Sequence, residues 1–233
     1  MDFSQFEQKI GIVFKNKNLL KEALTHRSYL NENPRWSVDF MSPHNERLEF
    51  LGDAVLELTS TEILFNKFPK SNEGEMTSIR AALVNYQMLA AVAKETGLDE
   101  FILLSKGEAK GPEGGKAREV ILANAFESLL GAVYLDDGYS SAKAFIEKFV
   151  MNHLDEVIEK KLYKDPKSLL QEIVQEKFKI TPTYSVLEEK GPDHAKIFKI
   201  GVYFGEKIMA DGEGLSKQEG EVEAAKNALK NVS

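Results

Sequence analysis

The chain has 233 residues, of which 42% are hydrophobic and 29% are charged, and its formal net charge is −7. It contains no cysteine, which excludes disulfides and thiolate metal sites. Its apolar runs are too short to cross a bilayer and its N-terminus has no signal-peptide core, so we expect a cytoplasmic protein of one or two domains without a membrane partner.

The negative charge is unevenly distributed along the chain. Residues 163–233 hold 11 lysines and 12 acidic residues, whereas the 19 basic and 25 acidic residues before them give a net charge of −6. Divalent cations bound in the first part would offset some of this excess, and the second part can still carry a local basic face. The total charge therefore does not exclude nucleic acid as a partner.

Residues 1–158 are predicted to form an all-α domain, because apolar residues recur at helical spacing and no strand-like alternation appears. The expected helices begin near Phe3 and then cover residues 17–29, 45–68, about 75–97, 120–135 and 141–158. Residues 71–74 are a plausible N-cap region, and residues 106–116 are expected to form a polar loop. Asp137-Gly138 is expected to end the buried helix over 120–135.

A different pattern follows a short charged linker over residues 159–164. A predicted helix over 168–178 precedes three segments with strand-like character, at 183–188, 195–204 and 207–212, and a closing helix over 216–231. We therefore expect a smaller α+β domain over 165–233, with the order α-β-β-β-α.

The run from Asn45 to Leu58 is the most informative segment. Glu46, Glu49 and Asp53 are separated by three and four residues, which places them on one face of a helix. Like charges kept beside an apolar core indicate a bound cation, and oxygen ligands favour Mg²⁺ or Mn²⁺. Glu57, four residues after Asp53, also fits this face by spacing alone.

A second acidic position lies in the apolar helix over 120–135. Asn124 and Glu127 are three residues apart and share one face of that helix. A buried carboxylate without a partner is costly. Glu127 could therefore pair with Arg47 or Arg80 in a structural ion pair, or it could point at a metal shared with the first acidic helix.

Glycines in both acidic helices would allow them to approach closely. Gly52 and Gly131 each cost about 1 kcal/mol of helix propensity relative to alanine, so their presence suggests a packing reason. By contrast, Glu73 is a loop glutamate of the kind that is usually only solvated, and a lone His26 is more often structural than catalytic. No phosphate loop, dinucleotide-binding motif or nucleophile elbow is present.

The run Asn45–Leu58 resembles the signature of the ribonuclease III endonucleases, and residues 23–29, 73–74 and 124–134 resemble the same family at the expected places. Residues 165–172, 191–195 and 212–217 resemble its attached double-stranded RNA-binding domain. The resemblance covers essentially the whole chain in the bacterial two-domain arrangement. It implies a homodimer through the nuclease domain, with a cleft for duplex RNA and one catalytic centre from each subunit.

The resemblance also assigns roles to the acidic residues. It implies that Asp53 and Glu127 are catalytic, and that the metal ligands are Glu49, Asp53, Asn124 and Glu127. Glu46 and Glu73 match the auxiliary acidic positions of the family. The implied reaction is Mg²⁺-dependent hydrolysis of both RNA strands, with Mn²⁺ able to substitute. It leaves 5′-phosphate and 3′-hydroxyl ends with short 3′ overhangs, and it serves the processing of ribosomal, messenger and other RNA.

In the second domain, the resemblance implies that Gln171, Glu172 and His194 face the minor groove of duplex RNA and that Lys217 faces the phosphates. A domain of this kind recognises the shape of A-form RNA over about 16 base pairs. Gln218 and Gly220 stand where the family usually has Lys and Ala. The missing charge is expected to lower the affinity and flatten its salt dependence.

Asn124 departs from the family pattern, which more commonly has Asp at this position. An amide oxygen can still bind Mg²⁺ but contributes no charge. Two functions therefore stay open: a double-strand-specific endoribonuclease, and a duplex-RNA-binding protein whose nuclease is weakened or silent because of Asn124. A carboxylate-bridged di-iron bundle would require Glu-x-x-His pairs, and the sequence contains none.

Overall fold

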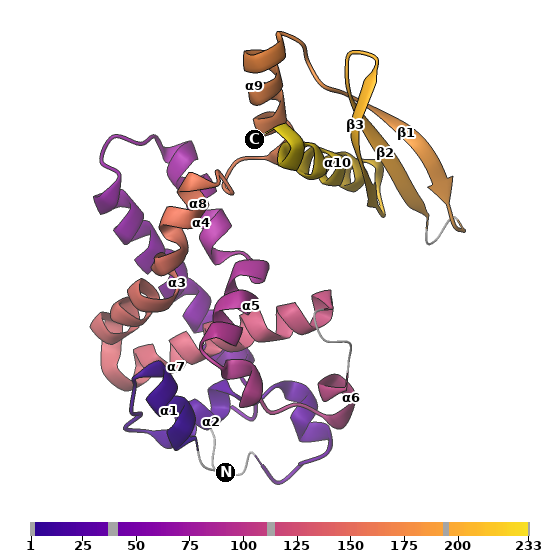
Figure 1. Cartoon of the computed structure of the whole chain (residues 1–233). Helices are drawn as coiled ribbons and strands as arrows, with labels where there is room; N and C mark the ends of the chain where they lie inside the picture. Colours follow the sequence, from indigo (N-terminus) through magenta and orange to yellow (C-terminus); the bar gives the residue numbers. More distant parts are fainter. Residues whose placement is uncertain (1–2, 37–41, 111–114, 193–195, 233) are drawn as a thin grey trace. The chain divides into compact units, whose positions relative to one another are not determined.

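The computed structural model describes residues 3–36, 42–110, 115–192 and 196–232 (Figure 1). The chain divides into two compact units, Met1–Tyr163 and Lys164–Ser233, called here the N-terminal and C-terminal units. No helix in the described part is long and apolar enough to cross a membrane. The precise domain limits and the linker over 159–164 stay a prediction.

The N-terminal unit is helical, as predicted. Its described elements are α1 (Ser4–Ile10), α2 (Lys17–Ala23), the 3-10 helix η1 (Arg27–Asn31), α3 (Glu46–Lys67), α4 (Glu73–Val84), α5 (Tyr86–Glu95), the 3-10 helix η2 (Leu98–Glu100), α6 (Lys106–Ala109), α7 (Lys116–Phe149), the 3-10 helix η3 (Met151–His153) and α8 (Leu154–Glu159). The long helices α3 and α7 pack extensively against each other, and fully buried Leu56 and Phe126 belong to the core around them. This pairing positions the two acidic segments.

Two of the predicted helices are interrupted. The helix expected over 17–29 ends at Ala23, because the backbone of Thr25 leaves it to form a bridge with Leu103. The helix expected up to about Gly97 is instead two helices, since the Asn85 side chain accepts a hydrogen bond from the backbone N–H of Met88 and begins α5. Both predictions of one continuous helix were wrong. The expected N-cap before α4 is confirmed.

The polar loop expected over 106–116 contains the short helix α6 and extends into residues 111–114, which lie outside the described residues. The break expected at Gly138 is confirmed, because this residue has φ 83° and ψ −176° inside α7 and divides it into two helical segments. The second segment ends at Phe149, and η3 and α8 complete the stretch predicted as one helix to residue 158.

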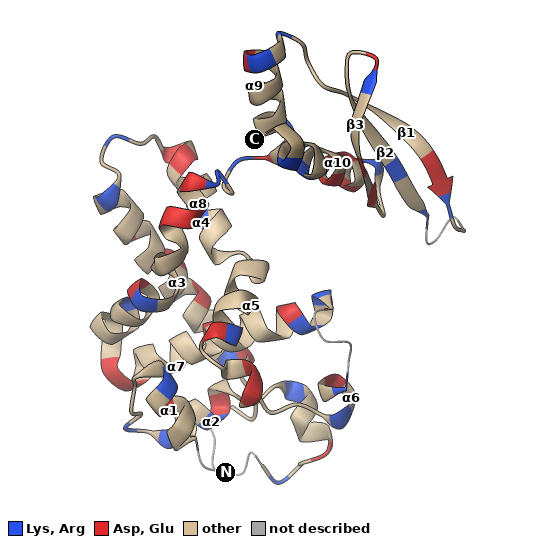
Figure 2. Ribbon diagram, viewed as in Figure 1, with Lys and Arg blue, Asp and Glu red and all other residues tan. Residues whose placement is uncertain are grey.

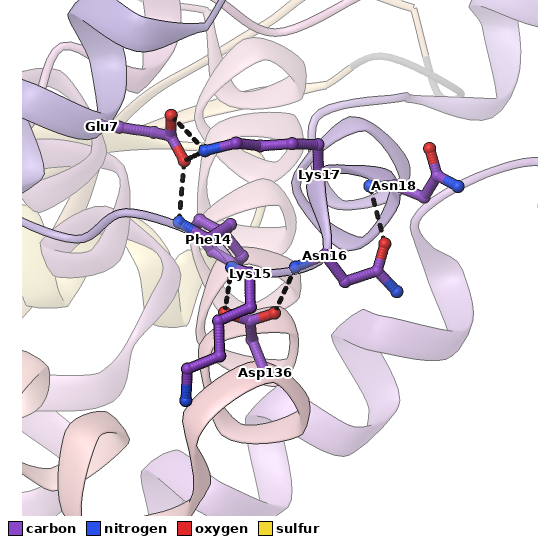
Figure 3. A network of polar contacts seen from close by, with 7 residues as sticks. All are labelled: Glu7, Phe14, Lys15, Asn16, Lys17, Asn18 and Asp136. Carbon is purple, nitrogen blue, oxygen red and sulfur yellow. Dashed lines mark hydrogen bonds and ion pairs between the residues drawn. The ribbon is translucent and has the colours of Figure 1, made fainter.

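A polar network fixes the connection between α1 and α2 (Figure 3). The buried Glu7 carboxylate accepts hydrogen bonds from the backbone N–H of Phe14, at 2.8 Å, and from Lys17 Nζ. The backbone N–H groups of residues 15 and 16 donate to Asp136 at 2.8 Å each. These carboxylates satisfy backbone donors that would otherwise lack a partner, so the network holds this loop against α7.

The C-terminal unit has the predicted α-β-β-β-α order. Its elements are α9 (Pro166–Phe178), β1 (Thr183–Lys190), β2 (Ile197–Phe204), β3 (Lys207–Gly214) and α10 (Lys217–Val232). The strands form an antiparallel sheet in the order β1-β2-β3, and α10 packs against β3, β2 and α9 (Figure 1). Gly212 is required at this contact, because a Cβ atom there would lie 2.2 Å from the backbone nitrogen of Ala224.

Candidate active site

Helices α3 and α7 cross with their backbones in direct contact. A Cβ atom at Gly52 would lie 1.8 Å from the carbonyl oxygen of Glu127, and one at Gly131 would lie 2.3 Å from that of Leu48. Only glycine allows this approach, which confirms the packing reason expected for both glycines. The crossing brings the face of α3 that carries Asp53 beside Glu127 of α7.

Glu127 lies in a field of like charges. Its partial burial, followed by the charges of Asp53, Glu49 and Glu57, raises the pKa of its carboxyl from the ordinary 4.5 to about 8. The other carboxylates therefore act on Glu127 through space, and water only partly screens the repulsion. This is the convergence of two acidic helices that the sequence predicts.

The alternative of a structural ion pair for Glu127 was wrong. Arg80 binds Glu57 instead, with 2.8 Å between its Nε and the carboxylate, and Arg47 acts on the buried Glu22. Within the described ranges, no arginine contacts Glu127. The charged groups that act on the Glu127 carboxyl are therefore other carboxylates, those of Asp53, Glu49 and Glu57.

Asn124 joins the same cluster through Glu49. Burial and then the charge of Glu46 raise the pKa of the Glu49 carboxyl, whereas a side-chain hydrogen bond from Asn124 lowers it and the charge of Asp53 raises it again. The Asn124 amide thus donates to a carboxylate on the opposite helix. Asp at this position would instead bring another negative charge.

The donor set at the crossing fits a hard divalent cation, because it offers carboxylate and amide oxygens and no sulfur or imidazole. No group of three or more His, Asp or Glu side chains among the described residues is drawn together closely enough to form a ready metal cage. A cation bound between these carboxylates would offset their mutual repulsion.

The two auxiliary acids lie in different surroundings. Glu46, in the first turn of α3, is half-exposed and lies 3.5 Å from Arg27 Nη1 and 3.8 Å from His44 Nδ1. Glu73 begins α4 and lines a cavity of about 230 Å³ that also includes Arg80. Glu46 therefore acts on the cluster through Glu49, whereas Glu73 is not among the groups that shift the pKa of Glu49 or Glu127.

Two features were missed or left undecided by sequence reasoning. Glu57 belongs to the acidic face, but its carboxylate is held by Arg80, which also donates to Thr61 Oγ1 at 2.6 Å. Phe50, next to Glu49 in the sequence, is 83% exposed at a cavity of about 650 Å³. A phenylalanine within an acidic segment was the sequence signal that could have indicated an exposed contact surface.

His26 has a structural role, as its more common interpretation predicts. Its Nδ1 lies 2.8 Å from Ser28 Oγ and accepts from the Ser28 backbone N–H at the start of η1. Burial is the main reason that its pKa is lowered. A neutral imidazole in this position caps a turn.

Three of the four residues expected to contact RNA belong to the two helices of the C-terminal unit, α9 and α10, on which basic and acidic residues both occur (Figure 2). Gln171 and Glu172 are exposed on α9, and Glu172 forms an ion pair with Lys164 at 2.6 Å. Lys217 begins α10 and its side chain is 59% exposed. His194 lies outside the described residues.

Comparison with known proteins gives two family matches. Residues 16–154 match the family described as Ribonuclease-III-like, and residues 166–232 match the double-stranded RNA binding motif. The chain belongs to the ribonuclease III family. The limits of the two matches fall within the N-terminal and C-terminal units described above.

Relatives in the ribonuclease III family match over nearly the full length. Ribonuclease 3 of Borreliella afzelii is 42% identical over 227 residues, which are 97% of this chain and 90% of the relative. Ribonuclease 3 of Carboxydothermus hydrogenoformans is 44% identical over 223 residues, with 96% and 92% covered. A structure of the nuclease domain of ribonuclease III from Campylobacter jejuni has a TM-score of 0.56 and 41% identity, covering 65% of this chain and 97% of that domain.

The family match and the attached RNA-binding motif establish the chain as an endoribonuclease of double-stranded RNA. No finding favours the alternative of a binding protein with a silent nuclease. The Campylobacter jejuni structure concerns flexibility in a region involved in dimer formation of that nuclease domain.

Proposed function

We propose that the crossing of α3 and α7 is a divalent-metal centre at which double-stranded RNA is hydrolysed. The metal ligands are Glu49, Asp53, Asn124 and Glu127, with Asp53 and Glu127 essential for the chemical step. The observation that carries the proposal is the position of Glu127, whose burial, together with the charges of the neighbouring carboxylates, raises its pKa to about 8. A cation there would favour the ionised form and turn repulsion into ligation.

Mg²⁺ is the proposed ion and Mn²⁺ an expected substitute, since both prefer oxygen ligands. When bound, such ions supply a nucleophilic water at neutral pH and stabilise the negative charge of the departing 3′ oxygen. The side chains of this chain hold the ligand atoms on two helices fixed by the Gly52 and Gly131 contact. A site on packed helices keeps its geometry better than a site on loops.

Secondary roles are proposed for the two auxiliary acids. Glu46 adds negative charge beside Glu49, and Arg27 partly balances it at 3.5 Å. Glu73, at the first residue of α4, is proposed to act only when RNA is bound. The products are proposed to carry 5′-phosphate and 3′-hydroxyl ends with short 3′ overhangs, as in the family that the chain resembles. Its natural substrates are proposed to include stems of ribosomal and messenger RNA precursors.

The active form is proposed to be a homodimer through the N-terminal unit. Phe50 is 83% exposed at a cavity of about 650 Å³, which Leu19, Leu51 and Leu135 also line. An exposed aromatic side chain beside an apolar cavity suits a two-fold contact, in which the same patch of both copies is buried. We expect Phe50→Ser to shift the chain from dimer to monomer in sedimentation equilibrium, whereas Phe65→Ser, at another exposed position on α3, leaves the dimer intact.

The C-terminal unit is proposed to hold the duplex for the nuclease. Gln171 and Glu172 present polar side chains from α9 to the minor groove, and Lys217 contacts phosphates. This division matches a general property of protein–RNA contacts, in which positive charge supplies affinity and shape-dependent contacts select A-form RNA. His194 is proposed to join the minor-groove contacts.

The test of the metal centre is cleavage of a long RNA duplex in Mg²⁺ by the unchanged chain and by Glu127→Gln. The variant is expected to lose at least about 100-fold in rate, because changes even to the surroundings of metal ligands cost up to that much. It should still bind the duplex in Ca²⁺ with unchanged affinity. Glu147→Gln, an exposed glutamate on the same helix, is the matched control and should cleave normally.

Two results would overturn this assignment. Retained cleavage by Glu127→Gln would remove Glu127 from the metal centre. Binding of duplex RNA by the unchanged chain, without cleavage at any Mg²⁺ concentration, would instead show that the nuclease is silent in this chain.

A further inference from the structure

Glu189, near the end of β1, lies between two lysines from other parts of the C-terminal unit. Its Oε1 is 3.7 Å from Lys217 Nζ, at the start of α10, and its Oε2 is 3.4 Å from Lys196 Nζ, just before β2. Across the sheet, Glu189 pairs in register with Phe198, and Lys217 Nζ lies 5.7 Å from the centre of that ring. Thus β1, β2 and α10 bring one carboxylate and two ammonium groups to the same place.

The geometry of this cluster indicates competition with RNA. The Glu189 and Lys217 side chains are 39% and 59% exposed, and 3.7 Å exceeds the length of a good hydrogen bond. Such an exposed pair holds its partners weakly and gives Lys217 no fixed orientation. The carboxylate would, however, repel any phosphate that approaches either lysine.

We propose that Glu189 limits the affinity of this chain for duplex RNA. In the free protein it is the counter-charge of Lys196 and Lys217, and the phosphates of an A-form duplex displace it on binding. Displacing Glu189 weakens the electrostatic part of the binding free energy. Contacts that depend on the shape of the duplex therefore contribute a larger share of the selectivity for RNA. This inference rests on the proposed phosphate contact of Lys217.

The test compares the full chain with Glu189→Gln in binding to duplex RNA in Ca²⁺ over a range of KCl concentrations. The duplex should exceed the span of about 16 base pairs that such a domain covers. Glu189→Gln is expected to lower Kd by about three- to tenfold at low salt and to steepen the salt slope by about 1. Glu206→Gln, an exposed glutamate in the turn between β2 and β3, removes the same charge elsewhere and should change neither value by as much.

The inference is overturned if Glu189→Gln behaves like Glu206→Gln. It is also overturned if Glu189→Gln weakens binding, because the carboxylate would then position the lysines rather than oppose phosphate.

A further variant separates this inference from the proposed role of Lys217. Lys217→Ala should weaken binding. The decrease in the logarithm of Kd caused by Glu189→Gln should be at most half as large in the Lys217→Ala variant as in the unchanged chain. If Lys217→Ala binds as tightly as the unchanged chain, the proposed phosphate contact fails and the inference fails with it. If Lys217→Ala weakens binding but Glu189→Gln changes nothing, only the inference fails.

Discussion

The acidic helix crossing in the N-terminal unit and the surface of the C-terminal unit differ in how their charged side chains are arranged. At the crossing of α3 and α7, Glu127 lies among like charges, partly buried, with its pKa raised to about 8. In the C-terminal unit, lysines lie beside carboxylates at the surface, as in Lys164–Glu172, Lys199–Asp211 and Lys217–Glu189. The first arrangement has an excess of one sign, whereas the second is nearly balanced.

This difference separates two ways of preparing a site for a charged ligand. Like charges in a partly buried site raise the free energy of the folded protein, and a cation that binds there relieves the repulsion. Exposed opposite charges cost little, and a phosphate can replace the carboxylate of each pair. The net charge of −7 therefore describes neither arrangement. It adds the excess of carboxylates at the helix crossing to the paired charges on the surface of the C-terminal unit.

The largest effect on stability is expected from adding a side chain at the close contact between α3 and α7. In Gly52→Ala the new methyl group would overlap the carbonyl oxygen of Glu127, 1.8 Å away. Because a backbone atom cannot move aside alone, we expect the free energy of unfolding of the N-terminal unit to fall by about 3 kcal/mol or more. Urea unfolding followed by circular dichroism measures it.

The matched control for this prediction is Gly74→Ala, also in a helix. Its methyl group would meet only the end of the Asn72 side chain, at 3.5 Å. Helix propensity favours alanine, so this variant should be as stable as the unchanged chain or slightly more stable. Equal losses in both variants would show that the crossing is not specifically close-packed.

The second effect is a pH dependence of stability without divalent ions. The pKa of Glu127 is about 8 in the folded protein and near its ordinary 4.5 when unfolded, so the folded state holds a proton between these values. The stabilisation from the protonated form is complete below about 4.5 and is lost as pH rises through about 8. In EDTA, the unchanged chain should therefore lose about 1–3 kcal/mol of unfolding free energy across this window, relative to Glu127→Gln.

A comparison of thermal unfolding for both proteins at several pH values checks this expectation. The variant should have the flatter profile, because Gln does not titrate. Parallel profiles would contradict the large upward shift in pKa.

Local sequence patterns predicted most of the elements, but not all of their ends and not the residues that they contact. The spacing of Glu49 and Asp53 gave a helix that the structure places at Glu46–Lys67, and the alternation of residues 195–204 gave the middle strand. In contrast, the end of α2 at Ala23 depends on a bridge to Leu103, far along the chain. Periodicity describes one segment at a time and cannot report such long-range contacts.

The same limit applies to the site. Glycines in both acidic helices signalled that the helices approach each other, and the contact at Gly52 agrees with this. The sequence could not decide which acid Arg80 would bind, because Glu57 and Glu127 were both available. The structure pairs Arg80 with Glu57, and among the described residues Glu127 has no arginine partner.

The third effect tests the departure at position 124. Asn124→Asp should lower the Mg²⁺ concentration for half-maximal cleavage by about three- to tenfold, since a carboxylate adds attraction for the ion. Without divalent ions the same variant should be less stable, because the hydrogen bond from the amide to Glu49 is replaced by repulsion. Cleavage rates over a Mg²⁺ titration and thermal unfolding in EDTA measure the two changes. The same half-saturation in both proteins would mean that residue 124 is not a ligand.

The smallest effect is expected from a buried polar group in the C-terminal unit. The Tyr184 hydroxyl is buried without a hydrogen-bond partner among the described residues, and burial, followed by the charges of Glu221 and Asp165, raises its pKa to about 12. Its ring packs against the core of the C-terminal unit, beneath Lys167 Nζ at 4.9 Å. Removing an unpaired hydroxyl while keeping the ring leaves the packing intact.

Tyr184→Phe should therefore leave the unfolding free energy of the C-terminal unit unchanged or raise it by less than about 1 kcal/mol. Duplex-RNA binding should not change, because the group is neutral and faces the core. Differential scanning calorimetry and a binding titration check both expectations. A loss above about 1 kcal/mol would mean that the hydroxyl has a bonding partner in solution.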